Sequence, residues 1–253
     1  MLLALDIGNT NIVVGLFDQQ DLVGHWRLTT DRHRTADELR LTTSALLDEA
    51  GVDPGQIAGV AVACVVPALH GPLQEGLEPL FGEAPRFLSA ATTPIPLLVT
   101  EPHAVGADRI ANCVAAHARY PGAVLVIDVG TALTFDLVGE DGAFLGGAIA
   151  PSMRLAARAL VDRAAQLFSV DLDVPCSVIG KTTAENLRSG VVLGFLDLVS
   201  GLIGRFRAEV ERPLRVIATG GNGDLFAKQI EAIECYDPFL TLEGLRLWWA
   251  APA

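Results

Sequence analysis

Positive charge is scarce in this sequence. Its 18 Lys and Arg residues are outnumbered by 30 Asp and Glu residues, which gives a formal net charge of −12. Nothing in the chain resembles the basic stripe with which proteins displace counterions from a phosphate backbone, so we do not expect direct nucleic-acid binding. The acidic balance still permits a small anion to be bound through backbone N–H groups.

Cysteine pairs, long apolar runs and a targeting segment are also missing. The 4 cysteines are far apart and have neither metal-ligand nor redox spacing, so we expect buried thiols in a reducing compartment. No unbroken apolar run approaches the ~18 residues that cross a bilayer. Asp6 ends the apolar segment Leu2–Leu5, and no basic residue precedes that segment. We therefore expect a cytoplasmic protein without a signal peptide.

Two common phosphate-binding patterns are incomplete. Gly180-Lys181-Thr182 resembles the end of a P-loop, but Pro175 occupies the position of the first glycine. Gly221 and Gly223 could begin a dinucleotide fingerprint, but Phe226 occupies the position of its third glycine. The sequence therefore supports neither a P-loop fold nor a Rossmann dehydrogenase.

Apolar residues make up 51% of the 253 positions, enough to build a sizeable core in one large domain or two small lobes. Their spacing predicts strands at 2–5, 12–17, 22–28, 57–66, 123–127, 133–138, 144–149 and 214–218. It predicts helices at about 35–50, 106–119, 154–167, 182–210 and 225–233. Capping-box patterns mark two of the helix starts, at Thr35 to Glu38 and at Thr182 to Glu185.

The second half of the chain repeats the opening of the first. The turns Asp6-Ile7-Gly8-Asn9 and Asp128-Val129-Gly130-Thr131 each follow an apolar strand and precede a hairpin. This repeat predicts an α/β protein of two duplicated lobes, 1–117 and 118–253, with a hinge helix joining them and a ligand cleft between. Each glycine allows close backbone approach, so successive N–H groups can form a nest for phosphate oxygens. The carboxylates would repel phosphate and would have to act through a cation. A third glycine-rich turn at 219–223 strengthens this interpretation.

Gly106-Ala107-Asp108-Arg109 precedes an apolar helix and has two interpretations. In one, Asp108 is an ordinary helix-start residue near the positive end of the helix dipole and Arg109 forms a surface ion pair. In the other, Arg109 binds a substrate carboxylate and Asp108 takes a proton from an attacking hydroxyl. Lys181 and Thr183 could line a site or could belong only to the start of a helix.

These segments together resemble the type III pantothenate kinases, a family of the acetate-and-sugar-kinase, heat-shock-chaperone and actin superfamily. The similarity covers nearly the whole chain, and the matching segments occur in the family's order. They are Asp6-Ile-Gly-Asn-Thr-Asn11, Val65-Val-Pro67, Gly106-Ala-Asp-Arg109, Asp128-Val-Gly-Thr131, Gly146-Gly-Ala-Ile-Ala-Pro151, Gly180-Lys-Thr-Thr183, Ala218-Thr-Gly-Gly221 and Glu243-Gly-Leu245.

The resemblance implies two actin-like (ribonuclease H-like) lobes and transfer of the ATP γ-phosphate to the 4′-hydroxyl of pantothenate. It implies that Asp108 is the proton acceptor, that Asp6 lies near Mg²⁺, and that Asp128 is the ligand of a monovalent cation, K⁺ or NH₄⁺. It also implies a homodimer with pantothenate and ATP as its partners. The implied ATP-binding residues are Asp6, Ile7, Gly8, Asn9, Thr10, Asn11, Ile12, Val13 and Thr131. The implied pantothenate-binding residues are Gly106, Ala107, Asp108, Arg109 and Thr183.

The chain departs from the family pattern at a few positions. Val99 stands where the family commonly has a Tyr that contacts the substrate, and Ser152 stands where a Gly usually follows Pro151. Thr182 replaces the Asn of the usual Lys-Asn-Thr. Two alternatives to a pantothenate kinase remain: a non-catalytic accessory protein on the same fold, and another superfamily enzyme such as a sugar kinase or a polyphosphate phosphatase. The retained Asp6, Asp108 and Asp128 argue against the accessory protein.

Overall fold

The computed structural model describes residues 1–164, 166–210 and 212–251, and the chain divides into two compact units. Unit 1 contains Met1–Arg119, Asp141–Leu145 and the C-terminal segment from Phe239. Unit 2 contains Tyr120–Glu140 and Gly146–Pro238. The sequence-based division into lobes 1–117 and 118–253 refers to the two duplicated halves of the sequence, and it stays a prediction.

Unit 1 is built on a five-stranded mixed sheet with the order β3-β2-β1-β4-β5. β1 pairs antiparallel with β2 and parallel with β4, and the antiparallel β1–β2–β3 meander is the one that the sequence predicts. The strands are β1 (Leu2–Ile7), β2 (Asn11–Asp18), β3 (Asp21–Thr29), β4 (Gly59–Cys64) and β5 (Arg86–Phe87).

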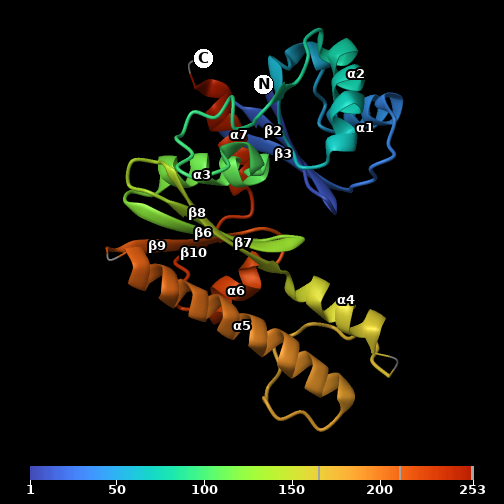
Figure 1. Cartoon of the computed structure of the whole chain (residues 1–253). Helices are drawn as coiled ribbons and strands as arrows, with labels where there is room; N and C mark the ends of the chain where they lie inside the picture. Colours follow the sequence, from blue (N-terminus) through green and yellow to red (C-terminus); the bar gives the residue numbers. More distant parts are fainter. Residues whose placement is uncertain (165, 211, 252–253) are drawn as a thin grey trace. The chain divides into compact units, whose positions relative to one another are not determined.

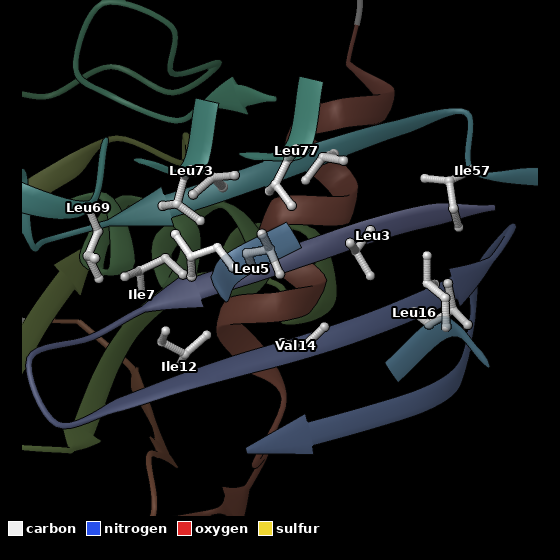
Figure 2. Packing of buried hydrophobic residues seen from close by; sticks show 14 of the residues in the cluster. Leu3, Leu5, Ile7, Ile12, Val14, Leu16, Ile57, Leu69, Leu73 and Leu77 are labelled. Carbon is white, nitrogen blue, oxygen red and sulfur yellow. The ribbon is translucent and has the colours of Figure 1, made fainter. Parts of the chain in front are cut away.

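Helices cover both faces of this sheet, because apolar side chains alternate between the two faces of each buried strand. On β1, Leu3 and Leu5 face a cluster that includes residues of α1 and α2 (Figures 1 and 2). Leu2 and Ala4 face the opposite cluster, which includes residues of α3 and α7. The helices of unit 1 are α1 (Ala36–Glu49), α2 (His70–Phe81), α3 (Ala107–Arg119) and α7 (Leu240–Ala250).

Unit 2 has a five-stranded sheet with the order β10-β9-β6-β7-β8. Its main cluster joins Leu125 and Phe135 of the sheet with Val199 of α5 and Phe226 of α6 (Figure 1). The strands are β6 (Ala123–Val129), β7 (Ala132–Val138), β8 (Phe144–Pro151), β9 (Leu214–Thr219) and β10 (Cys235–Tyr236). The helices are α4 (Met153–Arg163), α5 (Thr183–Val210) and α6 (Gly223–Gln229).

The two sheets have the same topology, which confirms the predicted duplication. Read from β8, the second sheet has the order β8-β7-β6-β9-β10, and each strand stands where its counterpart stands in β3-β2-β1-β4-β5. In both sheets the first strand pairs antiparallel with the second and parallel with the fourth. The Asp-x-Gly turns therefore connect equivalent strands, β1 to β2 and β6 to β7.

Several predicted elements need correction. The helix expected at 225–233 is α6, which ends at Gln229 because the buried residues Ile230 and Ile233 follow in a turn. The helix expected at 154–167 ends at Arg163. α2 and α7 were not predicted. All four cysteines are free thiols, but only Cys113 is buried: Cys64 and Cys235 are half-buried and Cys176 is exposed.

α5 is one continuous helix of 28 residues despite its four glycines. Its start is capped as expected, since the Thr182 hydroxyl accepts the N–H of Glu185 at 3.2 Å and the Glu185 carboxylate accepts the N–H of Thr182. Among the described residues α5 alone is long and apolar enough to cross a membrane, judged by length and composition, and 33% of its most apolar window is buried within the chain. A helix that packs in a soluble protein passes the same test.

Candidate active site

The first Asp-x-Gly turn is a compact, braced loop between β1 and β2. The N–H of Gly8 donates to the carbonyl oxygen of Asn11 at 3.0 Å, which closes the turn. Thr30 holds it from the side: its hydroxyl donates to the Gly8 carbonyl at 2.6 Å and its N–H to the Thr10 carbonyl at 3.0 Å. Asp6 is half-buried at the end of β1, and Asn9 is exposed. The turn thus presents polar groups on a fixed backbone.

The residues of this loop divide by the direction of their side chains. Ile7 and Ile12 are 1% and 3% exposed and point into the hydrophobic cluster of unit 1 (Figure 2), so they can offer a ligand only backbone groups. Val13 is half-buried. The exposed side chains of Asn9 and Thr10 supply hydrogen-bond donors and acceptors. This division fits a site that binds through the backbone nest and a few neutral side chains.

Asp108 and Arg109 lie in the first turn of α3. Oδ1 of Asp108 accepts the N–H of Arg109 at 2.8 Å. A Cβ on Gly106 would come within 2.5 Å of the same oxygen, so a larger residue there would displace the Asp108 carboxylate from its present position. Burial raises the pKa of Asp108 above its ordinary value, although the Arg109 N–H and the Arg109 charge both act to lower it.

The guanidinium group of Arg109 is placed over an aromatic ring. Its Cζ atom lies 5.2 Å from the centroid of the Phe144 ring, within the range of a cation–π interaction. This contact places the guanidinium group beside a buried ring, and the two interpretations of Arg109 stay open on the contacts described.

Val65 brings the first turn and the start of α3 together within unit 1. Its N–H donates to the carbonyl oxygen of Ile7 at 3.1 Å, which extends the β1–β4 pairing by one residue. Its Cγ1 atom lies 3.5 Å from the point where a Cβ on Gly106 would stand. The loop Asp6–Val13 and the segment Gly106–Arg109 therefore lie on either side of Val65.

In unit 2, the second Asp-x-Gly turn lies against the third glycine-rich turn. The N–H of Gly130 donates to the carbonyl oxygen of Ala132 at 3.0 Å. Asp128 pairs with Thr219 in the β6–β9 register, and a Cβ on the following Gly220 would overlap Oδ1 of Asp128. Gly220 has φ +83°, so its glycine is needed for conformation and for space. Asp128 is half-buried and Thr131 is exposed.

Thr183 is far from these turns in the sequence. It is the first residue of α5, and it is exposed. Lys181, also exposed, donates its backbone N–H to the carboxylate of Glu185 at 2.6 Å and belongs to the capping arrangement. The cap explains Thr182 and Glu185 in structural terms and leaves the hydroxyl of Thr183 at the surface.

Sequence reasoning did not single out Phe144 or Gly220 as individual residues. Phe144 was predicted as the first residue of a strand, but its position against Arg109 depends on the fold. The signal for Gly220 was present in the turn at 219–223, but its contact with Asp128 follows only from the β6–β9 register.

Comparison with known proteins gives one consistent family. The family model for type III pantothenate kinases matches residues 2–205. The type III pantothenate kinase of Roseiflexus sp. (strain RS-1) is 48% identical over 248 residues, which is 98% of this chain and 97% of that protein. The type III pantothenate kinase of Myxococcus xanthus is 42% identical with the same coverage.

Solved structures with low sequence identity share the fold. A Campylobacter jejuni protein assigned to the Baf family of transcriptional activators has a TM-score of 0.59 at 20% identity and covers 97% of this chain and 96% of its own. The ROK hexokinase of Thermus thermophilus has a TM-score of 0.50 at 17% identity, with 98% and 97% coverage. At these identities the likeness concerns the two-lobe α/β fold alone.

Proposed function

The chain belongs to the type III pantothenate kinase family, and we propose that it transfers the γ-phosphoryl group of ATP to the 4′-hydroxyl of pantothenate, the first step of coenzyme A synthesis. The observation that carries the proposal is the juxtaposition around Val65 in unit 1. It joins a loop suited to phosphate with a helix start that holds a carboxylate and a guanidinium group. Family membership removes the sugar kinase and the phosphatase from consideration.

Asp108 is the proposed proton acceptor. Pantothenate would place its 4′-oxygen at the γ-phosphorus; the P–O bond to ADP breaks as the new bond forms, and the hydroxyl proton passes to the Asp108 carboxylate. Since Oδ1 already accepts a backbone N–H, Oδ2 is the oxygen that would take the proton. The raised pKa of this carboxyl makes it a better base than an exposed aspartate. Its effect on the rate is modest if the transition state is loose.

Arg109 is the proposed partner of the pantothenate carboxylate, and Gly106 and Ala107 would line the same pocket. A guanidinium group binds a carboxylate through two parallel N–H bonds, which fixes the acid end of the substrate. The 4′-hydroxyl at the other end would then be held near Asp108, the adjacent residue. Orientation of this kind accounts for much of the rate gain in phosphoryl transfer.

The nucleotide would be held by the loop Asp6–Val13, and Thr131 is proposed as a further ATP-binding residue. Among the described residues there is no cluster of three or more metal-ligating side chains. This fits Mg²⁺, which proteins commonly bind through one or two carboxylates together with substrate phosphates. Asp6 would be the carboxylate, and the metal ion neutralises phosphate charge when it is bound.

Asp128 is the proposed ligand of a monovalent cation, K⁺ or NH₄⁺. Its carboxylate lies beside the backbone of Gly220. Oxygen donors of this kind suit hard cations.

A homodimer is proposed to cover the exposed face of α5, in a cytoplasmic enzyme. Four exposed glycines of α5 lie on one face of the helix at 3.6 residues per turn, and a Cβ on any of them would meet nothing within 4 Å: Gly190, Gly194, Gly201 and Gly204. Large apolar side chains are exposed in the segment from α4 to α5, namely Leu155, Leu160, Phe168, Val178 and Ile179. A second copy on this face would shield them and would carry its Thr183 toward a pantothenate pocket.

The deciding experiment is an assay of ATP-dependent pantothenate phosphorylation by the purified protein in K⁺ and in Na⁺ buffers. We expect phosphopantothenate in K⁺ and far less in Na⁺. Product in both buffers would keep the kinase and refute the role of Asp128. No product in either buffer, from folded protein that binds ATP, would refute the proposed function and favour the accessory protein.

A further inference from the structure

Phe144 has no role in the chemistry described so far, yet it is among the most deeply buried side chains. It is 2% exposed, and its ring centroid lies 5.2 Å from the Cζ atom of Arg109. An aromatic ring attracts a guanidinium group electrostatically and has no oxygen to accept its N–H groups in place of a substrate carboxylate. The contact can therefore fix Arg109 without competing for the same ligand-binding bonds.

The backbone of Phe144 is itself held on both sides. Its N–H donates to the carbonyl oxygen of Pro96 at 2.9 Å, and its carbonyl oxygen accepts the N–H of Leu98 at 2.9 Å. These two bonds form an isolated parallel bridge between Leu97 and Phe144. Nearby, the turn at Gly142 lies against the ring of His117 on α3, where a Cβ would come within 2.6 Å. The backbone that carries the Phe144 ring is therefore held in place by these hydrogen bonds.

The same bridge ties Arg109 to the segment that ends in Val99. Val99 follows Leu98 directly, is half-buried, and stands where the family commonly has a substrate-contacting Tyr. Because a valine offers a substrate no hydroxyl, recognition of the substrate under the proposed function would depend more on Arg109. The position of the guanidinium group then matters more than it would with two anchoring side chains.

We propose that Phe144 is a positioning residue that holds Arg109 for the carboxylate end of the substrate, and so determines the preference for an acid over its neutral counterpart. The inference rests on the proposed function and names a specificity determinant of the same site. It predicts that Phe144 matters for binding of the acid end and not for the chemistry at the hydroxyl.

The test compares two substrates in wild-type and variant enzymes. One is pantothenate, and the other is its neutral analogue, in which a hydroxymethyl group replaces the carboxylate. Phe144→Leu should lower kcat/KM for pantothenate about 2- to 30-fold, the range that loss of a cation–π contact allows, chiefly through KM. The value for the neutral analogue should stay within about 2-fold of wild type, since Arg109 has no carboxylate to bind there. Phe144→Tyr, which keeps the ring, should retain the wild-type preference.

Controls separate positioning from packing. Phe144→Met keeps most of the side-chain volume without an aromatic ring and serves if Phe144→Leu does not fold. The inference is overturned if a folded non-aromatic variant has kcat/KM lowered equally for both substrates, or lowered for neither. An inactive wild-type enzyme would overturn the proposed function first, so the two failures are distinguishable.

Discussion

α7 lies close against α3 at Gly244, and a single added methyl group there tests how tightly α3 is held. A Cβ on Gly244 would overlap the carbonyl oxygen of Ala111 and come within 2.5 Å of its carbonyl carbon. These are backbone atoms in the middle of a helix and cannot rotate away. The surrounding contacts resist separation: the Thr241 hydroxyl donates to Oδ1 of the buried Asn112 at 2.8 Å.

The size of the effect follows from this geometry. To restore an ordinary contact of about 3.5 Å with the Ala111 carbonyl carbon alone, the helices must separate by about 1 Å, and the overlapping carbonyl oxygen requires more. Overpacking of a close core contact costs about 1–3 kcal/mol, and an overlap with backbone atoms belongs to the upper part of that range, about 2–3 kcal/mol. The higher helix propensity of Ala offsets about 1 kcal/mol of this. For Gly244→Ala we expect a net loss of about 1–2 kcal/mol of unfolding free energy and a melting temperature lower by roughly 2–8 °C.

Thermal denaturation followed by circular dichroism measures the shift, and Gly71→Ala is the matched control. Gly71 lies at the start of α2, and a Cβ there would meet nothing within 4 Å. That substitution should leave stability unchanged or raise it by up to about 1 kcal/mol. Gly244→Ala at or above the wild-type melting temperature would refute the close crossing. Since Asp108 lies one turn before Asn112 on α3, the destabilised variant should also lose activity.

The remaining predictions concern the site and the assembly. Because burial raises the pKa of Asp108, its base form is lost at a higher pH than in an exposed aspartate, so kcat/KM should begin to fall on the acid side at that higher pH. Asp108→Asn should lower kcat about 100-fold, the lower end of the range for a lost general base because a loose transition state needs little proton transfer, with ATP binding kept; near-wild-type turnover would remove the base role. Asp128→Ala should abolish activation by K⁺ over Na⁺, and an unchanged K⁺ dependence would contradict the cation site. Val99→Tyr should lower KM for pantothenate by about 3- to 10-fold, the worth of one added hydrogen bond, and a higher KM would argue against its place at the substrate. Gly201→Leu should give a folded monomer in sedimentation equilibrium, and an intact dimer would place the interface elsewhere.

Much of the fold was predictable because its signals are local. The capping box at Thr35 is present with both hydrogen bonds, and the apolar runs fall within a residue or two of the strands. α2 was not predicted because its sequence contains Gly71, Pro72 and Pro79, which have low helix propensity. The helix forms nevertheless, and Leu73 and Leu77 on one face are buried. α7 escaped because its sequence carries Gly244 and two tryptophans, and its stability comes from packing against α3 and the sheet.

The residues of the candidate site also differ in how far the sequence could predict them. Asp6, Asp108 and Asp128 stand in short motifs that can be read from the sequence, and family resemblance attaches roles to them. Phe144 is 35 positions from Arg109, and no local pattern connects the two. Their contact arises only when the start of β8 bonds to Pro96 and Leu98.

Under the proposed function, the duplicated turns would give one structural unit two tasks. In the first, Asp6 is in register with Ala63 of β4, and the turn extends through Asn9, with neutral donors on a braced backbone. In the second, Asp128 is in register with Thr219, and Gly220 brings a backbone strand directly against the carboxylate. Neutral donors on a braced backbone would suit phosphate oxygens, whereas a carboxylate close to peptide groups would suit the proposed cation. The equivalent strands therefore give the turns their common position, and the residues that follow β4 and β9 would give them the different chemistry that we propose.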